Sequence, residues 1–230
     1  MIKFNISDRV GEIRFDRPAE GNAFTGEMVR QFHAALNDAT DKADILILTG
    51  EGADFTIGRD RKEPKSGAPF DAFRYINAVN QAMAAFPGII VASVRGRAHG
   101  LGVGLAMRSD IAIAADDARF ALDEVSHGIP PMFIMEAIVD HLAPKHALDI
   151  ILSGREFGAE EALKIGLLSR VVPAALLDAT VGTFAKELAG RDRAVVRACK
   201  GYLRKIVSVP RDARSAFALV EQTEFAMNKH

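Results

Sequence analysis

The chain begins with alternating apolar and polar residues, which predict a β-hairpin. The alternation runs over residues 2–6 and 10–15, and Ser7-Asp8-Arg9 is the predicted turn. Three later runs are short and continuously apolar, as in strands that are buried on both faces of a parallel sheet. These runs are Ile45-Leu46-Ile47-Leu48-Thr49, Ile89-Ile90-Val91-Ala92-Ser93-Val94 and Ile111-Ala112-Ile113-Ala114.

Segments with helical spacing of apolar residues separate these runs. Thr25 is the predicted cap of one helix, in which Phe32 and Leu36 share a face. A second helix is predicted over residues 70–86, after a loop at Glu63-Pro64-Lys65-Ser66-Gly67-Ala68-Pro69. Strands that alternate with helices predict an α/β fold with a parallel sheet built by right-handed crossovers.

The pattern becomes almost wholly helical after Pro130. One helix is predicted to begin at Ala159 and to end before Gly166, and the last begins at Pro210. We therefore predict two regions. Residues 1–172 form a core that contains the sheet and the candidate site, and residues 173–230 form a C-terminal helical region.

Composition narrows the functional classes. A chain of 230 residues with a formal net charge of -1 has no broad basic field, which argues against a nucleic-acid partner. No apolar run approaches the roughly 20 residues of a membrane span, and the N-terminus lacks the apolar core of a signal peptide. Cys199 is the single cysteine, so no intramolecular disulfide can form. We expect a cytoplasmic protein.

Two glycine-containing turns are the candidate anion sites. Phe55-Thr56-Ile57-Gly58-Arg59-Asp60 ends a predicted strand, and its functional interpretation requires the N–H of Ile57 to face a cavity. Gly96-Arg97-Ala98-His99-Gly100-Leu101-Gly102-Val103-Gly104 leads into a helix predicted to begin near Gly102, where amides and the helix dipole favour negative charge. Both segments are also compatible with a purely structural turn and with close packing of a helix on a strand.

Glu124 is the candidate acid/base because it follows these two turns. It comes directly after the apolar Phe120-Ala121-Leu122, although a lone glutamate is most often a solvated surface residue. His127, three residues later, could orient Glu124 or share its proton, and Asp123 is a titratable neighbour. Two amides and one carboxylate together indicate chemistry on a thioester enolate.

Other chemistries fit the sequence poorly. The spacing of a dinucleotide-binding motif that starts at Gly100 fails at Leu105, and no phosphate-binding loop follows. The nucleophile elbow of serine hydrolases is missing from the sequence, and the histidines lack the spacing of a zinc site, so we predict no metal. Cys199 lies in a helical stretch and is not a candidate nucleophile.

In combination these segments resemble the crotonase family of enoyl-CoA hydratases and isomerases over nearly the whole chain. The similar segments are Arg17-Pro18-x-x-x-Asn22-Ala23, Phe55-x-x-Gly58-x-Asp60, Gly96-x-Ala98-x-Gly100-x-Gly102, Phe120-x-x-x-Glu124-x-x-x-Gly128-Ile129-x-Pro131 and Ala159-x-x-Ala162-x-x-x-Gly166-Leu167. Each motif is weak alone, but their order and spacing together are strong.

The resemblance implies a spiral of ββα turns followed by helices that assemble a homotrimer, or a hexamer built as a dimer of trimers. It implies an acyl-CoA substrate, so coenzyme A arrives with the substrate and no separate cofactor is needed. The N–H groups of Ile57 and Leu101 would bind the thioester oxygen, and Glu124 would be the general acid/base. The residues expected to border the substrate and its coenzyme A are Glu20, Gly21, Ile57, Gly58, Arg59 and Asp60.

Two departures from the family pattern guide the choice of reaction. The hydratases use two glutamates to split water, and the first of them falls at Gly104 here; Leu101 also replaces the middle glycine of a triple-glycine turn. One remaining glutamate is the pattern of the enoyl-CoA isomerases, so we favour double-bond isomerisation. Hydration remains an alternative if Asp123 or His127 supplies the second acid/base. Other thioester reactions and a non-catalytic acyl-CoA-binding homologue are further alternatives.

Overall fold

The predicted hairpin is present at the N-terminus. Strand β1 (Ile2–Ser7) pairs antiparallel with β2 (Val10–Phe15), and Asp8 and Arg9 form the turn with φ angles of 48° and 66°. This computed structural model describes residues 1–64 and 69–228. Residues 65–68 of the predicted loop therefore lie outside the described residues, and helix α2 begins at Pro69.

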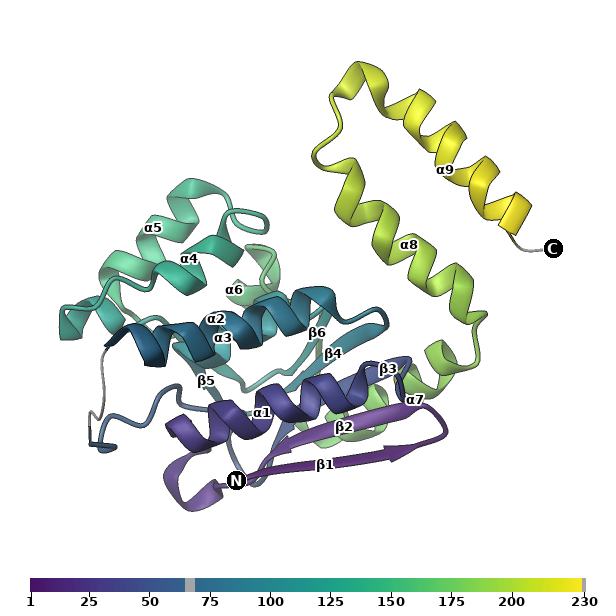
Figure 1. Ribbon diagram of the computed structural model, residues 1–230. Coiled ribbons are helices and arrows are strands. Elements are labelled where there is room, and N and C mark those ends of the chain that lie inside the picture. The colour runs from purple at the N-terminus through teal and green to yellow at the C-terminus, as the bar shows by residue number, and fades with distance from the viewer. Residues whose placement is uncertain (65–68, 229–230) are drawn as a thin grey trace. The chain divides into compact units, whose positions relative to one another are not determined.

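The hairpin continues into a parallel sheet, as the three apolar runs predict. Strands β3 (Ile45–Gly50), β4 (Ile89–Val94), β6 (Ile111–Ala115) and β9 (Arg170–Val172) follow β2 in the order β1-β2-β3-β4-β6-β9 (Figure 1). Every pair after β1–β2 is parallel. The carboxyl ends of β3 and β4 therefore lie at one edge, from which both glycine turns leave.

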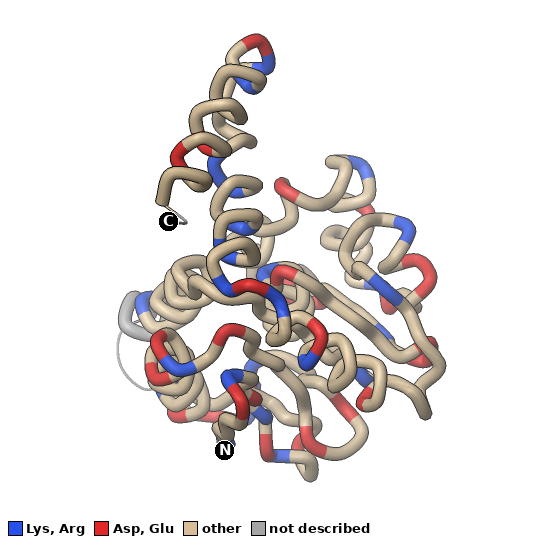
Figure 2. The backbone as a smooth tube through the Cα atoms, turned by 90° about the vertical axis from the view of Figure 1, so that its right-hand side faces the viewer, with Lys and Arg blue, Asp and Glu red and all other residues tan. Residues whose placement is uncertain are grey.

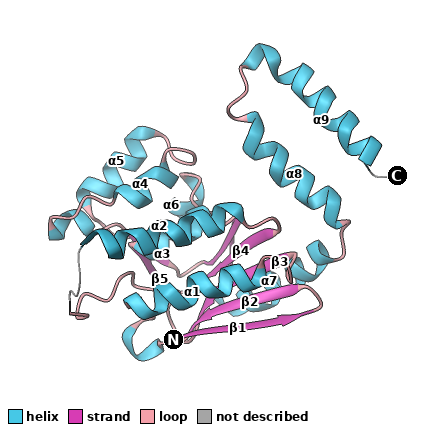
Figure 3. Ribbon diagram, in the orientation of Figure 1, coloured by secondary structure: helices cyan, strands magenta, loops and turns pink. Residues whose placement is uncertain are grey.

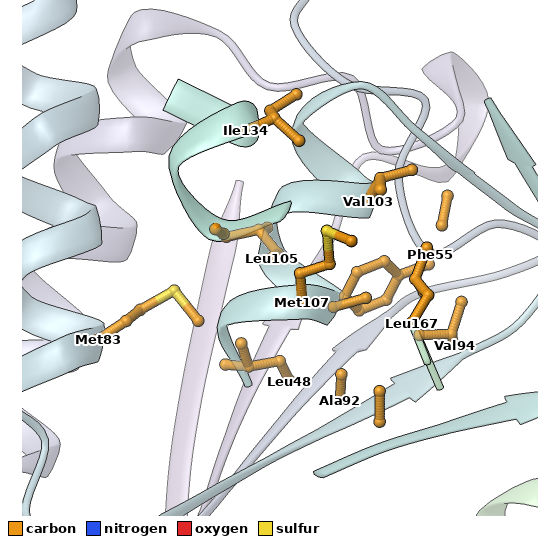
Figure 4. Packing of buried hydrophobic residues seen from close by; sticks show 14 of the residues in the cluster. Leu48, Phe55, Met83, Ala92, Val94, Val103, Leu105, Met107, Ile134 and Leu167 are labelled. Atoms are coloured by element: carbon orange, nitrogen blue, oxygen red, sulfur yellow. The ribbon is translucent and has the colours of Figure 1, made fainter. Parts of the chain in front are cut away.

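Helices bury both faces of this sheet. Leu46 and Leu48 point into a cluster with residues of α1 (Gly26–Ala39), α2 (Pro69–Ala85) and α3 (Leu101–Arg108) (Figure 3). Figure 4 shows part of this core, including residues of α3 together with Phe55 and Ile134. The alternate residues Ile45 and Ile47 face α7 (Leu177–Ala189) on the other side. The continuous apolar runs thus arise because both faces are covered.

A second, three-stranded sheet was not predicted. It consists of β5 (Arg97–His99), β7 (Arg119–Ala121) and β8 (Phe157–Gly158), in the order β5-β7-β8. Strands of two or three residues are too short to show a period-2 pattern. This small sheet is nevertheless what carries one glycine turn and the segment that leads to Glu124.

The described part of the first unit contains six further helices. They are η1 (Pro18–Glu20), η2 (Glu124–His127), α4 (Met132–Ile138), α5 (Pro144–Ser153), α6 (Ala159–Lys164) and η3 (Ala174–Leu176). The predicted helix end before Gly166 agrees with the structure, in which Gly166 has a φ of 88°. Such an angle favours glycine after a helix.

The chain divides into two units, Met1–Ala189 and Gly190–His230. This division differs from the predicted one at residue 172, because α7 packs on the sheet through Leu177, Val181 and Ala185. The second unit contains α8 (Arg193–Ile206), η4 (Arg211–Ala213) and α9 (Arg214–Asn228). Within it, the rings of Tyr202 and Phe217 stack with their centroids 5.7 Å apart.

Asn22 connects the N-terminal loop to the end of β3. Its side chain is fully buried: Oδ1 accepts a hydrogen bond from the Arg17 amide at 2.9 Å, and Nδ2 donates to the carbonyls of Glu51 and Asp54 at 2.9 and 2.7 Å. The Thr56 hydroxyl donates to the Asn22 carbonyl at 2.7 Å. These bonds satisfy one buried and two partly buried backbone groups, so they hold the first glycine turn in place.

We expect Asn22→Ala to lower the free energy of unfolding by about 2–4 kcal/mol, because it removes the hydrogen bonds of one buried and two partly buried backbone groups. Urea denaturation followed by circular dichroism measures this change. Asn37→Ala, at an exposed position of α1, is the matched control and should change stability by less than about 0.5 kcal/mol. Equal effects of the two substitutions would contradict the structural role of Asn22.

Candidate active site

Glu124 lies against the backbone of Gly100. It opens η2 just after β7, and its Oε1 lies only 2.6 Å from the position that a Cβ on Gly100 would occupy. Its Oε2 is buried and has no hydrogen-bond partner among the described residues. The carboxyl group therefore lies in space that a side chain at position 100 would fill. Its Oε2 is left without a hydrogen bond from the described residues.

The protonation of Glu124 follows from this environment. Burial raises the pKa of the Glu124 carboxyl above its ordinary value, since the ionised form loses hydration. The negative charge of Asp123 also raises this pKa, whereas its own backbone amide, Arg61 and His127 lower it. A carboxyl with a raised pKa and one oxygen without a hydrogen-bond partner is suited to take up and return a proton.

The second glycine turn agrees with its prediction closely. Helix α3 begins at Leu101, one residue before the predicted start, and Gly100 precedes it with φ 50° and ψ -112°. The Gly100 amide donates to the carbonyl of Ala121 at 2.9 Å, which connects this turn to the strand that leads to Glu124. Because helix N-termini leave their first amides without intrahelical partners, the Leu101 N–H is a donor at the edge of the carboxyl site.

The first glycine turn requires a correction. The N–H of Ile57 donates to the carbonyl of Gly21 at 3.0 Å, so this amide is already used by the fold and the prediction that it faces the site disagrees with this bond. Phe24 bonds to both neighbours of Arg59: its amide donates to the Gly58 carbonyl at 2.8 Å, and its carbonyl accepts from the Asp60 amide at 2.9 Å. Alternation along an extended segment therefore directs the Arg59 N–H to the other side.

The two turns meet at Gly58. Its φ is 92°, and a Cβ there would lie 3.6 Å from the Leu101 nitrogen and 3.0 Å from the His99 carbonyl oxygen. The amides of Arg59 and Leu101 have no acceptor among the described residues. The pair of available donors next to Glu124 thus consists of Arg59 and Leu101 rather than Ile57 and Leu101.

Several residues expected to border coenzyme A lie close together, but some of them already contact other side chains of the chain. Gly21 packs against Ile57: a Cβ on Gly21 would lie 3.0 Å from Ile57 Cγ2. The Arg17 guanidinium binds the Asp60 carboxylate at 2.5 Å and lies 3.4 Å from that of Glu20. This hydrogen bond from Arg17 is the main reason that the pKa of Asp60 lies below its ordinary value. The Asp60 carboxylate therefore stabilises the turn itself.

Asp123 and His127 lie beside Glu124, in an ion-pair cluster that the sequence did not predict. Arg61 Nη2 binds Asp123 Oδ1 at 2.7 Å, and Arg61 Nη1 contacts His127 Nε2. Burial alone would raise the pKa of Asp123, but the hydrogen bond and charge of Arg61 outweigh it and hold this pKa below the ordinary value. Asp123 is thus an ionised partner of Arg61 at neutral pH.

Position 104 faces apolar side chains. A Cβ on Gly104 would lie 3.3 Å from Ile134 Cγ1, so the space beside this residue is filled by an aliphatic group of α4. An apolar pocket also adjoins α3, and the residues that line it are Phe24, Val29, Phe32, Ile76, Val79, Leu101 and Leu105. The surroundings of α3 beside Leu101 are therefore apolar.

The described part of the chain contains no group of three His, Cys, Asp or Glu side chains arranged to hold a metal ion. None of its helices combines the length and apolar character that a membrane crossing requires. Lysines and arginines are interspersed with aspartates and glutamates along the backbone (Figure 2).

Sequence reasoning missed Arg61 and the Arg59 amide. Arg61 lies 62 positions before Asp123, and no local pattern connects the two residues. The Arg59 amide could have been favoured over that of Ile57 only by knowing which residues pair with Phe24. Both therefore depend on long-range contacts.

Comparison with known proteins places this geometry in context. A family model described as enoyl-CoA hydratase/isomerase matches residues 5–229. The chain is 35% identical over 229 residues to the probable enoyl-CoA hydratase echA8 of Mycobacterium tuberculosis, covering 94% of this chain and 89% of that protein. It is 32% identical to 4-chlorobenzoyl coenzyme A dehalogenase-1 of an Arthrobacter species, covering 82% and 72%.

Solved structures are also similar. An enoyl-CoA hydratase/isomerase family protein from Silicibacter pomeroyi superimposes with a TM-score of 0.91 at 28% identity, over 99% of both chains. A putative enoyl-CoA hydratase from Thermobifida fusca, solved with acetoacetyl-CoA, gives a TM-score of 0.90 at 25% identity, over 99% of this chain and 95% of that one.

The raised pKa of Glu124 predicts an unusual pH dependence of stability. The folded protein keeps the Glu124 proton to a higher pH than the unfolded chain, so wild-type stability falls as pH rises from the ordinary value of 4.5 toward the raised one. We expect Glu124→Gln to gain stability relative to wild type across this window and to keep that gain at higher pH. Urea unfolding at several pH values between about 4.5 and 8 measures it.

Glu27→Gln is the control with the opposite sign. The hydrogen bond from Arg30 lowers the pKa of the exposed Glu27, so its stabilising contribution is lost as pH falls through that lowered pKa. The removal of Glu27 should therefore give no gain with rising pH. If Glu124→Gln likewise gains nothing between acidic and neutral pH, the Glu124 carboxylate is not held in an unfavourable environment.

Proposed function

Because the chain belongs to the enoyl-CoA hydratase/isomerase family, we propose that it is an acyl-CoA enzyme in which Glu124 moves a proton at the carbon next to the thioester. The proposal rests on the environment of the Glu124 carboxyl, which lies against Gly100 and has a buried Oε2 without a hydrogen-bond partner among the described residues. A fold retains such a group at a cost in stability, which favours a functional role over a structural one.

The amides of Arg59 and Leu101 are proposed to bind the thioester oxygen. They come from the two turns that meet at Gly58, and Leu101 is the first residue of α3, where the helix dipole favours negative charge. The oxygen becomes negative when the neighbouring carbon loses a proton, so both donors strengthen in the transition state. Loss of one such donor has cost about 3 kcal/mol of transition-state stabilisation in other enzymes.

Double-bond isomerisation is the specific reaction that we propose. In this reaction one base removes a proton from C2 of a 3-enoyl thioester, and the same group returns it at C4, so a single acid/base suffices. Gly104 has no side chain, and the aliphatic Ile134 lies beside it. Asp123 is paired with Arg61 and stays ionised, which leaves Glu124 as the group with a suitable pKa.

Hydration is the second candidate, because several similar proteins, including the one from Mycobacterium tuberculosis, are named hydratases. It requires a second group to position water. His127 is exposed and close to Asp123, at 3.5 Å, so it is the better candidate for that role. A non-catalytic acyl-CoA-binding protein is the remaining alternative, and the catalytic test below separates it from both.

The assembly is proposed to be a homotrimer or a dimer of trimers. No residue of α9 is buried over Arg214–Asn228, and Leu219 and Met227 are 70% and 73% exposed. Apolar side chains left uncovered on a helical hairpin fit a surface that packs against other copies. A cytoplasmic location remains a prediction of the sequence.

We expect Glu124→Gln to reduce isomerisation of a 3-enoyl-CoA by about 10²–10⁴-fold and to leave binding of acyl-CoA nearly unchanged, because the amide retains the shape but cannot carry the proton. Turnover of 3-enoyl-CoA and of 2-enoyl-CoA should be followed in parallel, with binding measured by calorimetry. Glu187→Gln, at an exposed position of α7, is the control.

The outcomes separate the candidates. Preferred turnover of the 3-enoyl substrate supports isomerisation, and preferred hydration of the 2-enoyl substrate supports the second candidate. Tight binding with no turnover of either by the wild type supports the binding protein. Full activity of Glu124→Gln on both substrates would mean that Glu124 is not the base.

Arg59 is proposed to contribute its side chain as well, by contacting a phosphate of coenzyme A. The guanidinium is half-buried and lies 3.5 Å from Glu63, a pairing that is worth little and can be exchanged for a phosphate. We expect Arg59→Ala to weaken coenzyme A binding about 3–30-fold at low salt and less at high salt.

Arg9→Ala is the matched control for this measurement. Arg9 pairs with Asp44 at the hairpin turn, which lies at the opposite edge of the parallel sheet from Gly58. An affinity of Arg59→Ala that equals wild type at low salt would remove the Arg59 side chain from the site, while its amide could still serve as a donor.

A further inference from the structure

We propose that Arg61 is a positioning residue that clamps the turn carrying Glu124 and compensates the charge of Asp123. This inference rests on the proposed role of Glu124 as the base. It concerns Arg61, which lies 62 positions before Asp123 and belongs to none of the motifs that carry the resemblance. It assigns a function to a cluster that would otherwise be a surface ion pair.

The clamp is visible in the contacts of a single guanidinium. Arg61 follows the first glycine turn, whereas η2 consists of Glu124–His127 with Asp123 as the residue that precedes it. Arg61 Nη2 binds Asp123 Oδ1 at 2.7 Å, and Arg61 Nη1 contacts His127 Nε2. One side chain therefore holds both ends of the one-turn helix from which Glu124 projects, and it connects that helix to the segment that carries the Arg59 amide.

The same arrangement balances charge beside the base. Asp123 is adjacent to Glu124 in the chain, and its carboxylate disfavours ionisation of Glu124, whereas Arg61 favours it. Paired at 2.7 Å, the two charges largely cancel at Glu124. Burial then remains the main reason that the pKa of Glu124 is raised. Removal of either partner alone should expose Glu124 to the charge of the other.

The other titratable groups near this turn include His99 of β5, which interacts with the charge of Asp123 and lies 3.4 Å from Glu156. His127 lies 3.5 Å from Asp123 and accepts from Arg61 through Nε2 only while its ring is neutral. Helix α5, which packs on η2, carries Lys145, His146 and Asp149, and Asp149 is paired with Arg155 at 2.7 Å. Asp123 and Arg61 are therefore the pair whose removal changes the charge beside Glu124 most directly.

A stability measurement would not distinguish this role from that of an ordinary surface pair. The side chains of Arg61 and Asp123 are 53% and 33% exposed, and pairs of this kind contribute little to folding. The discriminating observable is the pH at which the base ionises. A purely structural role would change the rate at all pH values alike and leave that pH where it is.

The experiment measures exchange of the C2 protons of butyryl-CoA for deuterium as a function of pH, which reports on the base for isomerase and hydratase alike. We expect Arg61→Gln to move the acidic limb of the rate profile up by about 0.2–0.7 pH unit and Asp123→Asn to move it down by a similar amount. The double variant Arg61→Gln/Asp123→Asn should return the limb close to that of wild type. Arg61→Lys should leave the acidic limb at the same pH and lower the exchange rate at the plateau. The reason is that lysine retains the charge but cannot contact Asp123 and His127 with two separate nitrogens.

A matched surface pair is the control. Arg30 and Glu27 also lie 2.7 Å apart and are exposed on α1, so Arg30→Gln should leave the profile unchanged. A direct titration of the carbon-13-labelled Glu124 carboxyl by NMR, assigned with Glu124→Gln, gives the same shifts without any turnover and covers the case in which butyryl-CoA does not exchange.

Failure of this inference and failure of the proposed function give different results. If Glu124→Gln exchanges the C2 protons as fast as wild type, the proposed base is wrong. If Glu124→Gln is inactive but the limb and the NMR titration stay in place in both Arg61→Gln and Asp123→Asn, the base is right and the role of Arg61 is overturned.

Discussion

The candidate site depends on the backbone hydrogen bonds of one three-residue strand. In β5, Arg97 accepts from the Thr56 amide and His99 donates to the Thr56 carbonyl, which places the first glycine turn alongside the second. On its other side β5 pairs with β7, and the Gly100 amide donates to Ala121. Both amide donors and Glu124 are thus positioned through rigid backbone contacts, which is how a site obtains the small tolerances that proton transfer requires.

Close backbone approach is possible there because glycine occupies the contact points. A Cβ on Gly102 would lie 2.8 Å from the Thr56 carbonyl oxygen, and one on Gly100 would lie 2.6 Å from Glu124 Oε1. Side chains at these positions would push α3 away from the first turn and would displace the carboxyl group. The glycines of this segment therefore serve packing and chemistry together, and the two interpretations left open by the sequence are not exclusive.

Burial without a partner gives Glu124 its chemical character. The carboxyl loses hydration and gains no hydrogen bond at Oε2 from the described residues, so its pKa rises while Asp123, one residue earlier, is held ionised by Arg61. The pKa values of two adjacent carboxyl groups thus shift in opposite directions, because one group is buried without a partner and the other pairs with a guanidinium.

Local periodicity and the order of motifs were enough to predict the hairpin, the parallel strands, the helix after Thr25 and Glu124 as the candidate acid/base, because these signals depend on residues close together in the chain. The family resemblance implied Leu101 as a donor, and glycine spacing placed a helix start near Gly102, one residue after its start in the structure. The folded chain was needed to show that the Gly21 carbonyl accepts from the Ile57 amide, that the Arg59 amide is the candidate donor instead, and that Arg61 reaches Asp123. These contacts join segments that no local pattern relates, so they exist only once the chain has folded.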